Sequence, residues 1–256
     1  MGAEKPDNGM LDAQGYSHGN PEEGGISIVF PVYNEEDTIE QVVQSTLNFI
    51  PKLFRHYEII IVDDGSNDRS GDIIRQLSFD TEAIRGVYLP KNRGYGIALA
   101  SGFKVVRYPL VFFMDADGQF CISDIEKLLC YIEHYDIVIG SRCVRNDDLY
   151  RIFIGKVYNW LTCFLFGMKI KDITCGFKLF KTPILTMIGL KSRGGFINAE
   201  ILIKAKMRGC SLKEVTVQHL QRTQGTPSGA HPVVFIKKII ELLSMFFKIH
   251  CQKFLL

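Results

Sequence analysis

The sequence predicts an α/β protein with a mostly parallel central sheet that is flanked by helices. Two short apolar runs rich in β-branched residues, at 26–30 and 57–62, have the composition of strands buried on both faces of a parallel sheet. Each run is followed by a segment with apolar residues at helical spacing, at 37–49 and at 68–77. This order of strand, helix, strand and helix is typical of a doubly wound sheet.

The same two patterns continue along the chain. In the first half they predict, in order, a strand at 86–89, a helix at 96–106, a strand at 109–117, a helix at 122–134 and a strand at 135–142. In the second half they predict a helix at 150–166, a strand at 175–181, a helix at 199–207 and a strand at 211–220. The final segment interleaves apolar residues with lysines and is expected to form a long amphipathic helix from 233 to the end.

Composition limits the organisation and the partners of the chain. Its 256 residues suffice for one large domain, which we place at 26–230. Residues 1–25 are rich in Gly, Asn, Asp, Glu and Pro and are expected to be a disordered tail, while 231–256 is the amphipathic helix. With a formal net charge of only +2, no nucleic-acid partner is expected. Scattered cysteines, and the lack of a signal peptide or a long apolar run, indicate a cytoplasmic chain without a membrane span.

The sharpest chemical signal is the segment DADGQ at 115–119, where a strongly apolar strand stops. Two carboxylates one residue apart, Asp115 and Asp117, are costly to desolvate unless a positive charge joins them. A divalent cation bound to a diphosphate would supply that charge, because Mg²⁺ and Mn²⁺ prefer hard oxygen ligands. The alternative interpretation is a solvated loop or a helix cap, since aspartate also favours turns.

Two further polar segments follow the first two predicted strands. VDDGS at 62–66 is weak evidence alone, because strand-to-helix turns commonly use Asp, Gly and Ser for capping. PVYNE at 31–35 adds weight, since Tyr33 and Glu35 could stack on a nucleoside and hydrogen-bond to it. The alternative is an N-terminal capping arrangement for the following helix. The carboxyl ends of neighbouring parallel strands meet at one edge of a sheet, so we expect the three polar segments to converge there.

In this order and spacing, PVYNE, VDDGS and DADGQ resemble the nucleotide-sugar-binding half of family 2 glycosyltransferases, which have the Rossmann-like GT-A fold. Further matches are Asn92, Gly94 and Gly96, the segment GSR at 140–142, the segment DITCGF at 172–177, and Glu200. Together they are similar to the dolichol-phosphate mannose synthase and polyprenyl-phosphate glucosyltransferase group. The resemblance extends from Ile26 to about Ser228.

The resemblance implies a set of site residues. Those implied to bind the nucleotide sugar are Pro31, Tyr33, Glu35, Val62, Asp64, Asp115, Ala116, Arg142 and Arg222. The implied ligands of a divalent cation, Mg²⁺ or Mn²⁺, are Asp115, Asp117 and Gln119. The implied catalytic residues are Asp117, Arg142 and Arg222, and those for the acceptor phosphate are Arg142 and Arg151. An arginine fork suits phosphate because it binds two oxygens and keeps its charge, although either arginine taken alone is also typical of a surface ion pair.

The function implied is inverting transfer of a hexose, from a nucleotide sugar of the GDP-mannose or UDP-glucose type, to a polyprenyl or dolichyl phosphate. Two alternatives remain open: a soluble sugar or polysaccharide acceptor, and a nucleotide-sugar-binding subunit without catalysis. The aromatic segment at 150–166 and the C-terminal helix favour peripheral contact with the cytoplasmic face of a membrane. The bland alternative for both is core packing or a homo-oligomer contact, and some members of the family need a membrane partner subunit.

Overall fold

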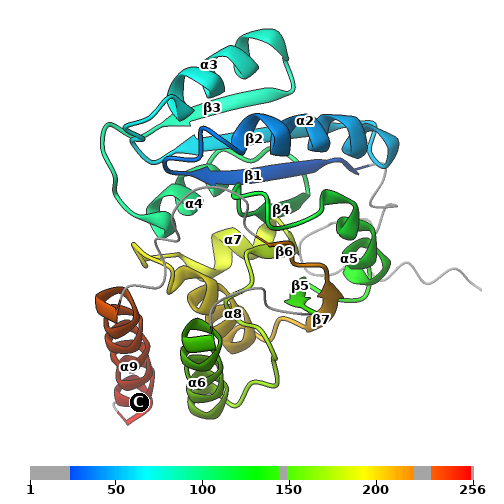
Figure 1. Cartoon of the computed structure of the whole chain (residues 1–256). Coiled ribbons are helices and arrows are strands. Elements are labelled where there is room, and N and C mark those ends of the chain that lie inside the picture. Colours follow the sequence, from blue (N-terminus) through cyan, green and yellow to red (C-terminus); the bar gives the residue numbers. More distant parts are fainter. Residues whose placement is uncertain (1–23, 144–148, 222–231, 255–256) are drawn as a thin grey trace, which may run out of the picture.

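The computed structural model describes residues 24–143, 149–221 and 232–254. Within these residues a seven-stranded sheet forms the centre, with the strand order β3-β2-β1-β4-β6-β5-β7 (Figure 1). The strands are β1 (Ile26–Val32), β2 (Tyr57–Asp63), β3 (Ile84–Tyr88), β4 (Leu110–Met114), β5 (Ile137–Arg142), β6 (Phe177–Lys181) and β7 (Leu212–Val217). The predicted α/β class with a mostly parallel sheet is confirmed.

One strand runs against the others. β1 pairs in parallel with β2 and β4, β2 with β3, and β5 with β7, whereas β6 lies antiparallel between β4 and β5. Met114 at the end of β4 pairs with Phe177 at the start of β6. The reversal therefore brings the segment before β6, with Cys175 and Gly176, to the carboxyl end of β4, where the DADGQ segment begins.

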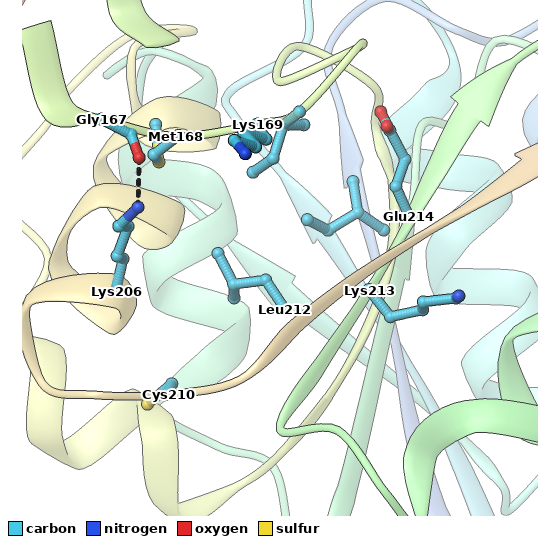
Figure 2. A pocket seen from close by; sticks show the side chains of 10 residues that line it. Gly167, Met168, Lys169, Lys206, Cys210, Leu212, Lys213 and Glu214 are labelled. Carbon is cyan, nitrogen blue, oxygen red and sulfur yellow. Dashed lines mark hydrogen bonds between the residues drawn. The ribbon is translucent and has the colours of Figure 1, made fainter. Parts of the chain in front are cut away.

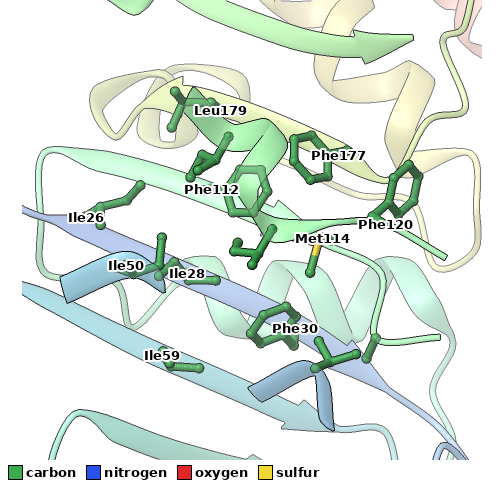
Figure 3. Close-up of a cluster of buried hydrophobic side chains, with 14 of the residues drawn as sticks. Ile26, Ile28, Phe30, Ile50, Ile59, Phe112, Met114, Phe120, Phe177 and Leu179 are labelled. Carbon is green, nitrogen blue, oxygen red and sulfur yellow. The ribbon is translucent and has the colours of Figure 1, made fainter. Parts of the chain in front are cut away.

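One face of the sheet is covered by α2 (Ile39–Phe49), α3 (Ser70–Asp80) and α5 (Ile125–Ile132). Alternate residues of each strand point to this face because successive side chains of a strand point to opposite sides. From β1 they include Ile26, Ile28 and Phe30, and from β4 Phe112 and Met114, all buried (Figure 3). Val29 of β1, which lies between two of them in sequence, belongs to the cluster on the opposite face.

The opposite face is covered by α4 (Tyr95–Phe103), α7 (Pro183–Ile188) and α8 (Ile197–Met207). α4 packs so closely on β1 that a Cβ at Gly102 would lie 2.5 Å from a methyl group of Val29. α6 (Leu149–Phe166) and α9 (Pro232–Phe254) contact each other beyond this layer (Figure 1). Leu242 of α9 is fully buried in the same core cluster, so one face of the C-terminal helix packs on the domain.

Several boundaries differ from the sequence prediction, and three short elements were missed. The helix predicted at 68–77 begins at Ser70, because Asp68 precedes it and accepts hydrogen bonds from the backbone of Ser70 and of Glu36. β4 ends at Met114, so Asp115 and Asp117 lie beyond the strand. The six-residue α7 and the short 3-10 helices at Ile50–Lys52 and Ile122–Asp124 were not predicted. Residues 1–23, with most of the predicted tail, lie outside the described residues, and the domain boundaries stay predictions.

Candidate active site

The polar segments that follow β1, β2 and β4 lie at one edge of the sheet. The three strands are parallel neighbours and end at Val32, Asp63 and Met114. Residues 33–35, 64–68 and 115–119 therefore leave the sheet side by side, at the edge where ligands bind in folds of this type. This is the convergence that the sequence predicted.

The loops after β1 and β2 are joined into one unit. Asn34 donates its backbone N–H to Ser66 Oγ at 3.0 Å, and its side-chain oxygen accepts from the backbone of Asn67 at 2.9 Å. Asn34 has a φ of 55°, a left-handed conformation that asparagine tolerates well. Tyr33 is 37% exposed and its hydroxyl accepts a hydrogen bond from Asn67, so its ring is presented at the surface.

Other residues expected to contact the donor are covered by the sheet. Pro31 and Val62 face each other in the register of β1 and β2, and both are buried. Glu35 is half-buried, and one of its carboxylate oxygens lies 3.4 Å from the Thr38 hydroxyl. The Thr38 hydroxyl donates its proton to the carbonyl of Ala116 at 2.8 Å. This threonine links the segment after β1 to the DADGQ loop.

Asp64 shapes the neighbouring loop rather than facing solvent. Its carboxylate is 2% exposed and accepts the backbone N–H groups of Arg93 and Gly94 at 2.7 and 2.8 Å. Burial raises the pKa of Asp64, and these two hydrogen bonds act against that rise. Gly94 needs its lack of a side chain, since its φ is 101° and a Cβ there would lie 2.5 Å from the carbonyl oxygen of Arg193.

Glu200 holds the loop on which this segment rests. The carboxylate is 2% exposed and accepts hydrogen bonds from the backbone of Lys191 at 3.0 Å, the backbone of Ser192 at 2.8 Å and the ammonium of Lys204 at 2.6 Å. The following Arg193 carbonyl accepts the N–H of Gly96 at 2.8 Å. Glu200, which the sequence analysis singled out only by resemblance, therefore supports the start of α4 through the loop at residues 191–193.

The first carboxylate of the DADGQ segment is enclosed by protein. The Tyr95 hydroxyl donates to Asp115 Oδ1 at 2.6 Å. Burial, together with the nearby charge of Asp117, raises the pKa of Asp115 to about 7. Tyr95, together with the cations of Lys178 and Arg142, opposes that rise. The site thus combines two close carboxylates with two positive side chains.

Arg142, at the end of β5, is fixed by an acidic partner. Its Nε and Nη2 donate to the two oxygens of Asp172 at 2.6 and 2.8 Å, and Nη2 also donates to the Thr174 hydroxyl at 2.9 Å. The two charged side chains are only 10% and 9% exposed, so this is a buried pair rather than a surface one. Asp172 is itself held by Glu214, whose carboxylate accepts the N–H groups of residues 171 and 172.

Glu214 also lines the pocket drawn in Figure 2, which has a volume of about 360 Å³. The pocket lies between β7 and the segment after α6, and Lys206 at its edge donates to the Gly167 carbonyl (Figure 2). Of the residues that the sequence analysis assigned to the site, none of those whose side chains the structure describes lines this pocket. It is therefore separate from the sheet edge where the polar segments converge.

The remaining predicted residues are placed only in part. The Gln119 side-chain amide donates to the Leu220 carbonyl at 3.3 Å, and its backbone carbonyl accepts from Leu220 at 2.8 Å. Arg222 lies outside the described residues, and Arg151 lies in the first turn of α6. Sequence reasoning missed the contributions of Tyr95, Thr38 and Lys178, because each depends on contacts between distant segments.

The donor atoms at the sheet edge fit a divalent cation that takes some of its ligands from the protein and the others from substrate phosphates. Among the described residues no three Asp, Glu, His or Cys side chains gather as a complete metal site. Magnesium is commonly bound by one or two carboxylates together with substrate phosphates and water. Asp115 and Asp117, at the end of an apolar strand, supply that number of carboxylates.

Two helices present apolar side chains to solvent. On α6, Phe153, Trp160 and Phe164 are 66%, 65% and 71% exposed, and the last two rings stack with centroids 5.6 Å apart. Their spacing places them on one face of the helix. The neighbouring α9 exposes a second such row, consisting of Ile236, Ile240, Leu243 and Phe247. No helix in the described ranges combines the length and the apolar character needed to cross a membrane.

Comparison with known proteins identifies the family. Residues 27–187 match the family described as glycosyl transferase family 2. The chain belongs to this family. Among its curated relatives are two bacterial proteins named undecaprenyl-phosphate 4-deoxy-4-formamido-L-arabinose transferase. The one from Pectobacterium atrosepticum is 33% identical over 204 residues, covering 78% of this chain and 61% of that protein. The one from Shewanella sediminis is 32% identical over 203 residues, covering 78% and 60%.

The family 2 chain thus spans about three fifths of the length of these relatives. Their names confirm the resemblance to the polyprenyl-phosphate glycosyltransferase group. Solved structures confirm the GT-A fold. Glucosyl-3-phosphoglycerate synthase from Mycobacterium tuberculosis, in complex with phosphoglyceric acid, superposes with a TM-score of 0.71 at 20% identity, covering 91% of this chain and 85% of that one. Its complex with Mn²⁺, uridine diphosphate and glucosyl-3-phosphoglycerate gives a TM-score of 0.66 at 21% identity, covering 92% and 86%.

Proposed function

We propose that this protein transfers a sugar from a nucleotide-sugar donor to a polyprenyl phosphate at a membrane surface, with the help of a divalent cation. The observation that carries the proposal is the pair Asp115 and Asp117 at the sheet edge, within electrostatic reach of Arg142. The names of the curated relatives support a polyprenyl phosphate as acceptor. The exposed apolar rows on α6 and α9 supply a surface that such a lipid substrate requires.

The donor binds along the ends of β1, β2 and β4. Tyr33 and Glu35 contact the nucleoside. The ring of Tyr33 is presented at the surface, where a base can stack on it. Pro31 and Val62 form the buried floor beneath them, and Asp64 holds the loop at residues 93–94 that borders the donor. The diphosphate lies against residues 115–119, with the Ala116 backbone fixed by Thr38.

Asp115, Asp117 and Gln119 would hold the cation, and Mg²⁺ or Mn²⁺ bound there would offset the charge of the departing nucleoside diphosphate. The acceptor phosphate is anionic at neutral pH, so the protein needs no strong base to activate it. Arg142 and Arg222 bind phosphate oxygens, and Arg151 assists on the acceptor side. The two hydrogen bonds that the Arg142 guanidinium donates to Asp172 keep it in one orientation for this task.

The reaction is a direct displacement. A phosphate oxygen of the acceptor forms a bond to the anomeric carbon, while the bond from that carbon to the donor diphosphate breaks and its electron pair leaves with the nucleoside diphosphate. The configuration at the anomeric carbon inverts, and no covalent enzyme intermediate is formed. The contribution of the protein is to position two anionic substrates and to stabilise the charge that moves onto the leaving group.

A donor and acceptor panel tests the activity. Purified protein is incubated with UDP-glucose, GDP-mannose or a nucleotide-linked 4-deoxy-4-formamido-L-arabinose, together with undecaprenyl phosphate, with and without Mn²⁺. We expect a lipid-linked sugar from one donor, and a loss of more than about 100-fold in Asp117→Asn, since even the outer partners of metal ligands are worth about 10- to 100-fold. Transfer only to soluble acceptors would favour the alternative substrate class, and donor binding without transfer would favour a non-catalytic subunit.

The membrane contact has its own test. Vesicles of phosphatidylethanolamine and phosphatidylglycerol are sedimented with the wild type and with Trp160→Gln and Phe164→Gln. We expect both variants to bind more weakly, because each removes an exposed aromatic ring from α6. Phe79→Gln is the matched control, since Phe79 is 88% exposed on α3, at the far end of the molecule from α6 and α9 (Figure 1). Equal binding by all four proteins would contradict this surface assignment.

A further inference from the structure

A chain of polar side chains, of which Lys178 and Asn198 are buried and Tyr95 is half-buried, leads to Asp115. Lys178 of β6 donates its ammonium to Asn198 Oδ1 at 2.8 Å. Asn198, in the first turn of α8, also interacts with the hydroxyl of Tyr95. Tyr95, the first residue of α4, donates to Asp115 Oδ1 at 2.6 Å. The chain thus links β6, α8 and α4 to the carboxylate that follows β4.

The hydrogen-bonding capacities of these groups fix the direction of the chain. An ammonium can only donate, so the side-chain oxygen of Asn198 must face Lys178. The amide NH₂ of Asn198 is then left for the Tyr95 oxygen. Tyr95 in turn directs its own proton to Asp115, which serves as the acceptor at the end of the chain. Bonds that all point the same way polarise and strengthen one another.

Packing keeps both ends of this chain in place. Lys178 is fully buried, donates also to the Cys175 carbonyl, and has its nitrogen 5.3 Å from the centre of the Phe113 ring. A Cβ at Gly176 would lie 2.1 Å from Oδ2, 2.4 Å from Cγ and 2.6 Å from Oδ1 of Asp115. The backbone of Gly176 therefore packs against the whole carboxylate, while the Tyr95 hydroxyl bonds to Oδ1.

We propose that Tyr95 is a positioning residue that holds the Asp115 carboxylate in the orientation required for the divalent cation, with Asn198 and Lys178 fixing the Tyr95 hydroxyl. This inference rests on the proposed function, because it assumes a cation at Asp115. Partners of metal ligands commonly contribute about 10- to 100-fold to metal affinity. Tyr95 does not itself touch the cation or the reacting atoms, so its removal weakens cation binding and leaves turnover at saturating cation little changed.

The test measures cation binding directly. Mn²⁺ is titrated into the protein in the presence of UDP or GDP, and the unbound ion is followed by its electron paramagnetic resonance signal. We expect Tyr95→Phe to raise the dissociation constant of Mn²⁺ about 10- to 100-fold, with kcat at saturating Mn²⁺ within about a factor of three of wild type. Tyr131→Phe is the matched control, because Tyr131 lies at the surface on α5 and this substitution also deletes only one hydroxyl.

A second variant tests the chain itself. Asn198→Ala should weaken Mn²⁺ binding in the same direction, and adding it to Tyr95→Phe should cost little more, because both changes break the same connection. Thermal unfolding shows that each variant is folded before titration. Mn²⁺ binding by Tyr95→Phe equal to that of wild type, or tighter, would overturn the inference while leaving the proposed function intact. Absence of Mn²⁺ binding by the wild type with either nucleotide would overturn the proposed function, and this inference with it.

Discussion

Replacing Glu200 with glutamine should destabilise the protein strongly, because it removes a charge that three donors share. The backbone N–H groups of Lys191 and Ser192 and the ammonium of Lys204 all bond to this one carboxylate. Glutamine keeps one acceptor oxygen but directs an NH₂ group at a donor. The loop at 191–193 loses its anchor as a result, and with it the support of Gly96, whose N–H bonds to the Arg193 carbonyl.

The size of the effect follows from these bonds. A hydrogen bond to a charged group contributes about 1.5–3 kcal/mol, and at least one of the three is lost. Lys204, whose side chain is only 20% exposed, is left without its counter-charge. Breaking a buried pair by removing one partner typically costs about 3–5 kcal/mol, which is the loss of unfolding free energy we expect for Glu200→Gln at pH 7.

The pH dependence of the unfolding free energy gives a second test, because the pKa of Glu200 fixes the direction of the change. Burial alone raises the pKa of Glu200, but the bonds from Lys204 and Ser192 outweigh it, so the pKa lies below its usual 4.5. The unfolded state therefore binds the proton first as pH falls, and the stability that Glu200 contributes is present above about pH 4.5 and is lost below it. Urea unfolding at pH 7, 5 and 4 should show the difference between wild type and Glu200→Gln shrinking toward acid.

Glu241 of α9 supplies a control with the opposite sign. Burial and the charge of Glu200 raise its pKa, so its ionised form costs stability in the folded state. Glu241→Gln should be neutral or stabilising at pH 7, and its advantage over wild type should fade as pH falls. A Glu200→Gln variant that loses under about 1 kcal/mol, or whose deficit is the same at every pH, would refute the assignment of Glu200 as the anchor of the 191–193 loop.

Three further substitutions test neighbouring parts of the site. Gly176→Ala should weaken Mn²⁺ binding in the titration described above, because the new methyl group would sit 2.1 Å from Asp115 Oδ2, whereas Gly194→Ala, with nothing within 4 Å, should not. Lys178→Met should lose stability relative to wild type between pH 8 and 10.5, by at most about 3 kcal/mol, because burial lowers the pKa of Lys178 to about 8 and the folded wild type releases its proton first; a difference that stays constant in urea unfolding would contradict this. Asp64→Asn should speed amide hydrogen exchange at residues 93 and 94, whose N–H groups bond to Asp64, and unchanged exchange there would contradict that role.

Much of the fold could be predicted because the strands of its first half are simple apolar runs. β1, β2 and β4 are buried on both faces, so their composition identifies them without knowledge of their neighbours. The direction of β6 could not be predicted, since FKLFK reads the same whether its partners run with it or against it. α7 was missed because a helix of six residues shows less than two turns of periodicity.

The sequence could predict the parts of the candidate site that follow the ends of strands. It could not predict the contacts between segments that are far apart in the sequence. DADGQ, VDDGS and PVYNE each stand at a strand end, so the parallel order of the strands is enough to bring them together. The contact between Tyr95 and Asp115 depends instead on how α4 packs on the sheet, and Asn198 and Lys178 join it from α8 and β6. No local pattern in the sequence reports such packing, although a lysine within an apolar strand at 177–181 is an unusual residue to bury.

The two interpretations left open for the acidic segments can now be weighed against each other, and each is favoured at a different place. Both Asp64 oxygens accept backbone N–H groups, so the VDDGS segment acts as a structural clamp of the capping kind. Asp115 is half-buried beside Asp117, and loss of solvent and that second charge raise its pKa to about 7 in spite of the hydrogen bond from Tyr95. A carboxylate so disfavoured in its ionised form gains more from a bound cation than a solvated turn residue would. The cost of ionising Asp115 therefore supports a cation site there rather than a loop cap.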